Sequence, residues 1–302
     1  TFVLNPGDDT DLNEGGSGTD TVQINGGGGA EAFTVPANGT RVRFDRLDPA
    51  PFALDIGTCE NLVLNANGGN DTLSCTGNLA ALIQITADGG AGDDTLLGSN
   101  GADVLLGGDN NDFIDGQQGN DVVFLGAGDD IFQWDPGDGS DTVEGQSGSD
   151  RMVFNGSAGA EIFEVSANVA RVRFTRNLGN IVMDLDDVET LDVNALGNTD
   201  TVIVNDVTGT DLTSVNVDLA GTLGGSAGDA LADTIIVNGT GLPDTINLTA
   251  NVGAVEVSGL AALVRIEHPE VAYDHLTVNG LGGTDNIITG SGVTTLIGVT
   301  VN

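Results

Sequence analysis

Residues 89–133 read GGAGDDTLL, GSNGADVLL, GGDNNDFID, GQQGNDVVF and LGAGDDIFQ, which is a nine-residue repeat without a gap. After an insert of Trp134 and Asp135, PGDGSDTVE and GQSGSDRMV continue the repeat to residue 153. A single Gly-Asp turn is common in proteins, but this many turns in register predict a repeat architecture. The sixth position is always aspartate: Asp94, Asp103, Asp112, Asp121, Asp130, Asp141 and Asp150. The eighth position is always apolar: Leu96, Leu105, Ile114, Val123, Phe132, Val143 and Met152.

The repeat predicts an all-β fold, a parallel β-roll or β-helix solenoid with little or no helix. Each unit is expected to form a six-residue turn and a three-residue strand, so that two units complete one flattened coil of eighteen residues. Successive coils should stack at about 4.8 Å, the hydrogen-bonding distance between strands. The aspartates then fall into two rows, with Asp94, Asp112 and Asp130 on one edge, Asp103 and Asp121 on the other, and Asp141 and Asp150 continuing the rows.

Rows of carboxylates at this spacing repel one another unless a cation lies between the turns. Ca²⁺ accepts about six to eight oxygen ligands in flexible geometry, whereas Mg²⁺ requires a stricter octahedron. Histidine and cysteine are absent from residues 89–153, which argues against zinc and other transition metals. Glycine suits such turns because it reaches positive φ and lets carbonyl groups face the ion. The sequence therefore predicts several Ca²⁺ ions, held by side chains or turn carbonyls of Asp94, Asp103, Asp112, Asp121, Asp130, Asp141, Asp150, Gly89, Ala91, Gly92, Gly98, Asn100, Gly101, Gly107, Asp109, Gly116, Gln118, Gly119, Gly128 and Gly139, with Asp11 and Asp20 as further candidates.

Metal binding is also expected to drive folding. Three-residue strands make a thin core, and a glycine-rich chain loses much conformational entropy on folding. The nonapeptide block should therefore be disordered without Ca²⁺.

The whole chain of 302 residues is strongly acidic, with 45 Asp and Glu against 8 Lys and Arg and a formal charge of −37. This charge argues against nucleic acid and anionic membrane surfaces as partners and favours cations. Disorder is not expected, since 39% of the residues are hydrophobic and recur in short β-branched runs. No apolar run reaches the ~18 residues of a membrane span. The chain begins without a signal-peptide pattern, so we expect a mature product, an excised fragment or export without an N-terminal signal.

A longer repeat surrounds the nonapeptides. Residues 20–44 (DTVQINGGGGAEAFTVPANGTRVRF) align with 150–174 (DRMVFNGSAGAEIFEVSANVARVRF), and a more divergent copy begins near residue 233. FTVPANGTRVRF and FEVSANVARVRF are expected to form hairpins with Ala-Asn turns. We divide the chain into a first flanking repeat at 1–88, the nonapeptide block at 89–153, a second flanking repeat at 154–232 and a third at 233–302.

With its GGxGxDxUx nonapeptides and its flanking DTVxxNG and RVRF segments, nearly the whole chain resembles the bacterial hemolysin-type calcium-binding (RTX) proteins. The nonapeptides are the specific part of this resemblance. The resemblance implies secretion by a type I route, Ca²⁺-dependent folding outside the cell, and a matrix, adhesin or carrier role.

Four arginines of the hairpins have two interpretations. Arg41 and Arg43 share one strand face, as do Arg171 and Arg173. We favour a solvated face that pairs local carboxylates. The alternative is a docking site for an acidic partner, such as a second copy of this chain.

Several Gly-Asp turns stand outside the block. Because a Ca²⁺ site needs a stacked partner turn, Asp71, Asp200 and Asp285 are expected to belong to plain turns. Asp11 and Asp20 correspond to Asp141 and Asp150 in the longer repeat, but no turns precede them. They are expected to be either empty or completed by another molecule.

Cysteine and histidine are rare in this chain. Cys59 and Cys75 align with apolar residues of the second repeat, which implies burial, either as a disulfide between adjacent coils or as two thiols. His268 and His275 are expected to be surface-loop residues rather than metal ligands.

The favoured function is structural: a secreted Ca²⁺-binding protein that joins head to tail into an extracellular filament, matrix or surface layer. Neither TFVL at the start nor TLIGVTVN at the end looks like a solenoid cap, which favours a contact that does not close into a ring. An adhesin stalk, or a carrier fragment of a larger type I-secreted protein, is the alternative. No enzyme activity is expected, because no G-x-S-x-G, H-E-x-x-H or Ser/His/Asp set is identified and the paired carboxylates lie in Gly-Asp turns as ligands.

Overall fold

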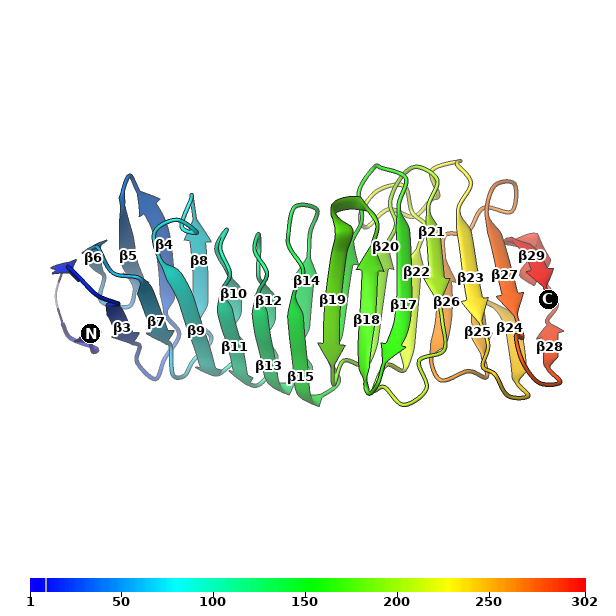
Figure 1. Cartoon of the computed structure of the whole chain (residues 1–302), viewed down its shortest axis with the longest axis horizontal. Helices are drawn as coiled ribbons and strands as arrows, with labels where there is room; N and C mark the ends of the chain where they lie inside the picture. The colour runs from blue at the N-terminus through cyan, green and yellow to red at the C-terminus, as the bar shows by residue number, and fades with distance from the viewer. Residues whose placement is uncertain (9) are drawn as a thin grey trace. The chain divides into compact units, whose positions relative to one another are not determined.

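The computed structural model describes residues 1–8 and 10–302 and consists almost entirely of short strands (Figure 1). The chain divides into two compact units, Thr1–Asp150 (unit 1) and Arg151–Asn302 (unit 2). Two 3-10 turns, η1 (Leu178–Asn180) and η2 (Val293–Thr295), are the helical segments of the described residues. No helix in these ranges is long and apolar enough to cross a membrane. The predicted all-β solenoid with little or no helix is confirmed.

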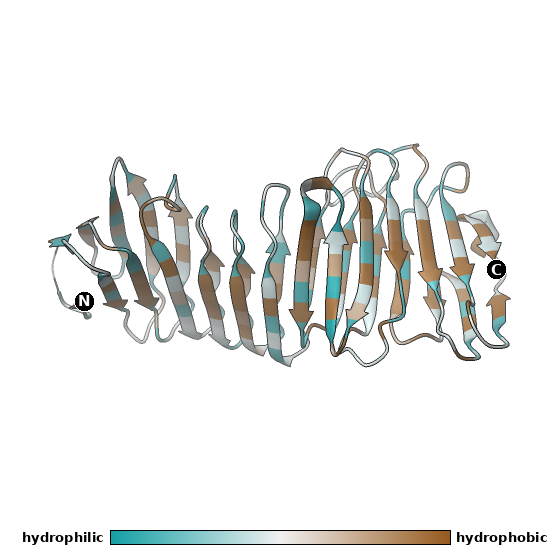
Figure 2. Ribbon diagram, viewed as in Figure 1, coloured by the Kyte–Doolittle hydropathy of each residue, from teal (hydrophilic) through white to brown (hydrophobic). Residues whose placement is uncertain are grey.

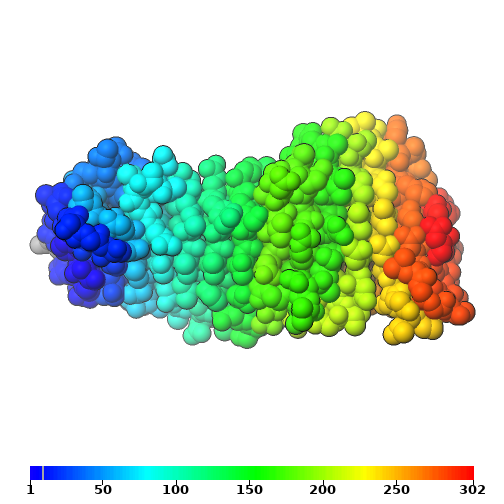
Figure 3. Space-filling view, in the orientation of Figure 1, coloured from blue at the N-terminus to red at the C-terminus, as the bar shows by residue number. Residues whose placement is uncertain are grey.

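Unit 1 contains two mostly parallel sheets, and the chain returns to each of them coil after coil. The space-filling view shows the same advance as successive bands of colour (Figure 3). The first sheet has the spatial order β1 (Phe2–Leu4), β3 (Thr21–Asn25), β7 (Asn61–Asn65), β9 (Gln84–Ala91), β11 (Val104–Asp109), β13 (Val122–Gly128) and β15 (Thr142–Gly148). The second has the order β2 (Asp11–Glu14), β6 (Phe52–Gly57), β5 (Arg41–Asp48), β4 (Ala32–Asn38), β8 (Thr72–Thr76), β10 (Thr95–Leu97), β12 (Phe113–Asp115) and β14 (Ile131–Trp134).

Unit 2 is built in the same way from two sheets. One has the order β19 (Ile181–Asp186), β18 (Arg171–Arg176), β17 (Ile162–Asn168), β21 (Thr201–Val204), β23 (Thr234–Asn238), β27 (His275–Asn279) and β29 (Gly298–Val301). The other has the order β16 (Arg151–Asn155), β20 (Thr190–Asn194), β22 (Ser214–Asp218), β26 (Leu263–Glu267), β25 (Ala254–Ser258), β24 (Thr245–Asn251) and β28 (Asn286–Thr289).

The length of the repeat sets the register of the nonapeptide block. Val104 of β11 pairs in parallel with Val122 of β13, one eighteen-residue coil later, as predicted. The Trp134–Asp135 insert lengthens the next coil by two residues, since Val122 pairs with Thr142 of β15. The strands of this sheet are longer than the expected three residues, because the first turn residues pair as well; Gly108, for example, lies opposite Gly126.

The core of each unit lies between its two sheets. Strand residues alternate between buried and partly exposed positions, as the brown and teal bands along the strands indicate (Figure 2). Every predicted eighth-position side chain of the repeat is 1% exposed or less. Burial of such aliphatic side chains is the main favourable contribution to folding that each coil makes without a metal.

Three antiparallel excursions interrupt the parallel stacking, namely β4–β5–β6, β17–β18–β19 and β24–β25–β26. The two predicted hairpins are confirmed, but the predicted Ala-Asn turns are wrong. Those residues pair within the strands, so the turns lie one step later, at residues 39–40 and 169–170. Aromatic rings fill the core of these coils; Phe154 and Phe174, for example, lie edge to face with centroids 4.8 Å apart.

Candidate calcium sites

The aspartates of the nonapeptide block form two hydrogen-bonded rows in unit 1. In each row the backbone amide of one aspartate donates to Oδ1 of the aspartate one coil later. The first row joins Asp71 to Asp94 (2.7 Å), Asp94 to Asp112 (2.8 Å), Asp112 to Asp130 (2.7 Å) and Asp130 to Asp150 (3.0 Å). The second joins Asp103 to Asp121 and Asp121 to Asp141, both at 2.8 Å. The predicted stacking of alternate turns is therefore confirmed.

The second carboxylate oxygen of most row members is buried without a hydrogen-bond partner. This holds for Oδ2 of Asp71, Asp94, Asp112, Asp121, Asp130 and Asp141. These residues are at most 3% exposed, so water cannot replace the missing partner cheaply. Asp103 differs, because its Oδ2 accepts the Ser99 amide at 2.5 Å. The rows thus present a line of buried oxygen atoms that lack a positive charge.

The glycines that open the repeats leave room beside these oxygens. A Cβ atom on Gly107 would lie 2.4 Å from Asp112 Oδ2 and 2.3 Å from the Leu125 carbonyl oxygen. A Cβ on Gly89 would likewise meet Asp94 Oδ2 and a carbonyl of the next coil. Carboxylate and carbonyl oxygens therefore converge where only glycine fits. This donor set, made of oxygen atoms alone, suits Ca²⁺ rather than a transition metal.

Burial changes the titration of the row. It raises the pKa of Asp112 to about 7 and that of Asp121 to about 9, with repulsion from neighbouring aspartates adding to the effect. Burial also raises the pKa of Asp94 to about 6. Without a cation, these carboxyl groups hold protons at a pH where free aspartate is ionised. The residues present fit Ca²⁺, which when bound would neutralise the carboxylates and link adjacent coils.

The other predicted ligand positions have varied surroundings. Gly92, Gly119 and Gly128 have positive φ values of 134°, 145° and 156°. Asn100 uses its side-chain oxygen to accept the backbone amides of Leu79 and Ala80. Ala91 and Asp109 pair with each other across β9 and β11, and Gln118 is exposed. The remaining glycines each lie against backbone or side-chain atoms of another coil or of their own turn; they are Gly98, Gly101, Gly116 and Gly139. Metal coordination by these residues stays a prediction.

The two candidates near the start of the chain are placed differently from each other. Asp11 is exposed at the start of β2. Asp20 does have a stacked neighbour, because its amide donates to Oε2 of Glu60 at 2.7 Å. Its Oδ2 is buried without a hydrogen-bond partner, so Asp20 resembles the row members and Asp11 does not.

The expectation that the turns of Asp71, Asp200 and Asp285 lack stacked partners is wrong. Asp71 continues the first row, and Asp285 Oδ1 accepts the amide of Asp244 at 2.9 Å. Asp200 lies within a further row in unit 2. Coils of irregular length hid these partners, because the stacked residues are 23 to 41 positions apart rather than eighteen.

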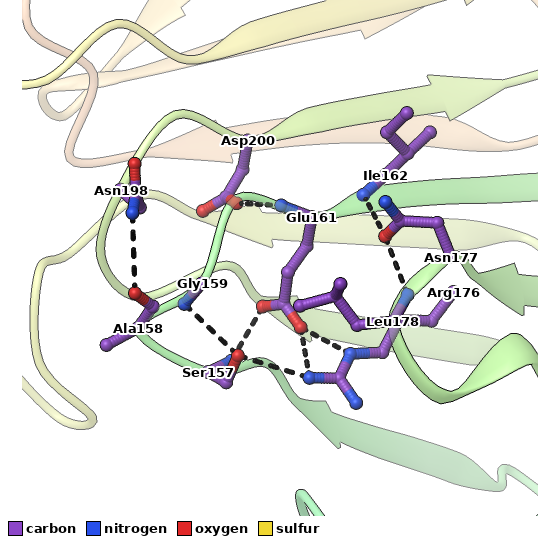
Figure 4. A network of polar contacts seen from close by, with 10 residues as sticks. All are labelled: Ser157, Ala158, Gly159, Glu161, Ile162, Arg176, Asn177, Leu178, Asn198 and Asp200. Atoms are coloured by element: carbon purple, nitrogen blue, oxygen red, sulfur yellow. Dashed lines mark hydrogen bonds and ion pairs between the residues drawn. The ribbon is translucent and has the colours of Figure 1, made fainter.

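Two buried Glu–Arg pairs were missed by the sequence analysis. Arg46 contacts Glu31 at 2.9 Å in unit 1, and Arg176 contacts Glu161 in unit 2 (Figure 4). Each glutamate occupies the sixth position of a Gly-opened turn, and each arginine follows fifteen residues later. This shared spacing in the aligned repeats is the signal that could have revealed them. In both turns a guanidinium group neutralises the carboxylate, whereas the corresponding carboxylates of the block have an oxygen without a hydrogen-bond partner.

The four hairpin arginines that the sequence singled out mostly follow the favoured interpretation. Arg41 pairs with Glu14 and Asp55, both at 2.5 Å, and Arg171 with Asp184 and Asp186. Local carboxylates therefore neutralise these side chains. Arg43 likewise pairs with Asp45 at 2.7 Å, and Arg173 is exposed.

The two cysteines are unpaired with each other, and the two histidines lie in different kinds of segment. Cys59 and Cys75 are two buried free thiols, so the disulfide alternative is not supported. His268 lies in a turn, as expected, where its Nδ1 is 2.6 Å from Asp218 Oδ1; with Glu267 these residues form an acidic group that could reach one metal ion. His275 begins strand β27 and contacts Thr300, so its assignment to a loop is wrong.

The prediction that the sequence contains no G-x-S-x-G string is wrong. Residues 224–228 read GGSAG, which matches the G-x-S-x-G of nucleophile elbows. That motif acts at a tight strand-to-helix turn. Here Ser226 is exposed in the irregular segment between β22 and β23, and the next element of the chain is strand β23 rather than a helix.

Comparison with known proteins supports the assignment of the block. Residues 86–114, 97–132 and 137–159 match the model of the RTX calcium-binding nonapeptide repeat (4 copies). Residues 86–159 thus carry RTX calcium-binding nonapeptide repeats, as the resemblance indicated. No curated protein matches the chain. Among solved structures, the extracellular lipase LipA from Serratia marcescens is similar at 13% identity and a TM-score of 0.17, over 68% of this chain and 43% of the lipase. The chain therefore spans less than half the length of that enzyme.

Substitution of Arg176 by methionine should destabilise the protein by about 3–5 kcal/mol, because it leaves Glu161 as a buried charge without its partner. Urea unfolding at saturating Ca²⁺ measures the change. The double variant Arg176→Met with Glu161→Gln should recover most of the loss. Arg173→Met is the matched control on the exposed face of β18; an equal loss in this control would contradict the role given to Arg176.

The ion-free protein should lose stability as the pH rises from about 4 to about 9. The row aspartates have folded pKa values of about 7 (Asp112) and about 9 (Asp121), above the ordinary value of 3.8. Protons therefore favour the folded state; the contribution is complete below pH 3.8 and is lost as the pH passes the folded values. The folded fraction in EDTA, followed by circular dichroism between pH 4 and pH 9, measures this trend. Saturating Ca²⁺ should reverse it, because protons compete with the cation; identical slopes with and without Ca²⁺ would count against the rows as metal sites.

Proposed function

We propose that this chain is a secreted, non-catalytic structural protein whose solenoid folds when Ca²⁺ binds between its coils. The observation that carries the proposal is the line of buried, unpartnered Oδ2 atoms in the two aspartate rows. Desolvated carboxylates at strand spacing oppose folding unless a cation neutralises them. The formal charge of −37 extends the same requirement to the whole chain.

Secretion is the part of the proposal that rests on the repeat family. The repeats in residues 86–159 are of a kind that is exported by type I routes and folds outside the cell. The external medium supplies Ca²⁺ at concentrations that suit weak extracellular sites, about 10⁻⁴–10⁻³ M. Folding that waits for this ion keeps the acidic chain unfolded before export.

A rigid structural role is supported by the arrangement of the carboxylates. They lie in rows along stacked turns, where each Oδ1 accepts a backbone amide. This arrangement orients oxygen atoms towards a cation between coils and gives no single acid–base pair for catalysis. A spacer in an extracellular matrix, filament or surface layer uses such a solenoid directly. An adhesin stalk or a carrier portion of a larger protein is the alternative use.

Trp134 gives a direct measurement of folding. It is the single tryptophan of the sequence, it is fully buried, and its Nε1 donates to the Gly139 carbonyl at 2.8 Å. Its fluorescence should shift from exposed to buried as Ca²⁺ is added to the EDTA-treated chain, together with a gain of β-structure in circular dichroism. A chain that is equally folded in EDTA would refute the proposal.

Asp112→Asn should raise the Ca²⁺ midpoint of this transition by roughly tenfold or more, because Ca²⁺ affinity follows the charge of the ligand set. Asparagine at position 112 still accepts the Asp94 amide, so the stacking contact is kept. Asp93→Asn is the matched control, since Asp93 is exposed in an adjacent turn and its Oδ1 accepts the Asn111 amide. Equal midpoints for the two variants would argue against the row as the Ca²⁺ site.

The proposed structural role also includes head-to-tail assembly of the chain. Parallel sheets grow by the addition of strands at their edges, and β1 and β29 each pair with one neighbour in the described chain. Addition of millimolar Ca²⁺ should then produce fibres in negative-stain electron microscopy and growing particles in light scattering. A stable monomer under these conditions would favour the stalk or carrier role.

A further inference from the structure

Unit 2 contains a row of acidic residues that lies largely outside the nonapeptide repeats. The amide of Glu161 donates to Oδ1 of Asp200 (2.8 Å), that of Asp200 to Asp233 (2.8 Å), and that of Asp233 to Asp274 (3.1 Å). All four residues are at most 3% exposed. The row repeats the geometry of the calcium block with no GGxGxD sequence at Asp200, Asp233 or Asp274.

The first turn of this row carries its own cation. Arg176 contacts the Glu161 carboxylate, and its guanidinium also reaches Ser157 Oγ at 3.1 Å. Glu161 Oε2 accepts the Ser157 amide at 2.6 Å, so both of its oxygens are satisfied (Figure 4). This turn has no need of a metal ion.

The next turn, which ends at Asp200, has the same contacts but no cation. Asp200 Oδ1 accepts the Glu161 amide, while Oδ2 is buried without a hydrogen-bond partner and points away from the network in Figure 4. Asp200 is 2% exposed, which leaves water little access to this oxygen. The ion pairs of Arg151, Arg176 and Arg265 go to other carboxylates of unit 2.

Further oxygen donors lie against the Asp200 turn. Oδ2 of Asp229 accepts the Asn198 amide at 2.7 Å, which places this carboxylate on the turn itself. Asp233 follows directly in the row, one coil on. The Asp200 turn therefore has the carboxylates of Asp229 and Asp233 as neighbours, and carboxylate oxygens are the ligands that a hard divalent cation prefers.

Unit 1 contains the same order of turns. Glu31, neutralised by Arg46, donates its amide to Asp71, and Asp71 Oδ2 is buried without a partner. Asp71 is then followed by Asp94, the first aspartate of the calcium block. The turns of Asp71 and Asp200 also share an alanine at the first position instead of glycine. Asp200 therefore occupies in unit 2 the place that opens the calcium row in unit 1.

We propose that unit 2 holds a Ca²⁺ ion of its own between the turns that end at Asp200 and Asp233, with Asp229 as an additional ligand. The proposal rests on the proposed function only for the identity of the ion. In this arrangement the Arg-neutralised turns of Glu31 and Glu161 are each followed by a turn that binds Ca²⁺. Ca²⁺ then orders the second flanking repeat as well as the nonapeptide block.

The test compares the full-length chain with its Asp200→Asn and Asp206→Asn variants. Asparagine at 200 can still accept the Glu161 amide, so the row remains paired and only the charge is lost. Asp206 is an exposed turn residue of unit 2 whose Oδ1 accepts the Thr208 amide, which makes it a matched control. Equilibrium dialysis counts Ca²⁺ per chain, and hydrogen exchange reports the amides of residues 195–201 and 229–234.

Asp200→Asn is expected to bind one Ca²⁺ fewer than the wild-type chain, while Asp206→Asn binds the same number. At a free Ca²⁺ concentration of ~100 times Kd, binding should slow exchange in these two segments by up to about 100-fold in the wild type. This slowing should be lost in Asp200→Asn, and Asp233→Asn should reproduce the loss.

An unchanged count of ions in Asp200→Asn, with equal exchange rates in EDTA and Ca²⁺, would overturn the proposal, because Asp200 would then be a protonated core carboxyl group. The Trp134 transition separates this failure from a failure of the proposed function. A chain whose Trp134 responds to Ca²⁺ but whose Asp200 site is empty keeps the calcium block and loses only the second site. A chain that binds no Ca²⁺ refutes both.

Discussion

The structure depends on the neutralisation of carboxylates that are stacked one coil apart. Each row member uses Oδ1 to accept the amide of its neighbour, and this contact fixes the side chain in the interior of the turn. In Asp112, Asp121 and Asp200, among others, Oδ2 is buried without a hydrogen-bond partner in surroundings where water cannot solvate a charge. A solenoid of this kind is stable only when protons, guanidinium groups or metal ions supply the missing positive charge.

The chain combines a built-in cation with sites for an external one. Arg46 and Arg176 neutralise Glu31 and Glu161 inside the protein, in coils whose cores also contain clustered phenylalanines. The nonapeptide coils have mainly aliphatic cores, with Phe132 and Trp134 at their end, and no buried arginine among their described residues. The flanking coils therefore supply part of the required positive charge themselves, whereas the described nonapeptide coils contain no buried arginine that could do so. We therefore expect the coupling of Ca²⁺ binding to folding to be strongest in the nonapeptide coils.

Glycine and coil length determine where a cation can fit. At Gly107 the Asp112 carboxylate and the Leu125 carbonyl approach so closely that a β-carbon would collide with both. The regular eighteen-residue coil repeats this geometry, and the two-residue insert at Trp134–Asp135 is absorbed without breaking the row, since Asp121 still bonds to Asp141. The antiparallel excursions lengthen other coils but return each sixth-position acid to its row, as Glu161 and Asp200 demonstrate.

The sequence by itself determined the solenoid class, the coil length and the two aspartate rows of the block, because a strict nine-residue period fixes both the side-chain face and the strand register. It did not reveal that Asp71, Asp200 and Asp285 are stacked, since their partners are 23 to 41 residues away across coils of unequal length. It also left the partner of each buried glutamate open, because Arg46 and Arg176 look like ordinary hairpin residues until the strands are paired. Only the tertiary structure decides which acidic side chains are paired with arginine and which have an oxygen without a partner. The reason is that this pairing depends on distances between residues that no sequence period relates.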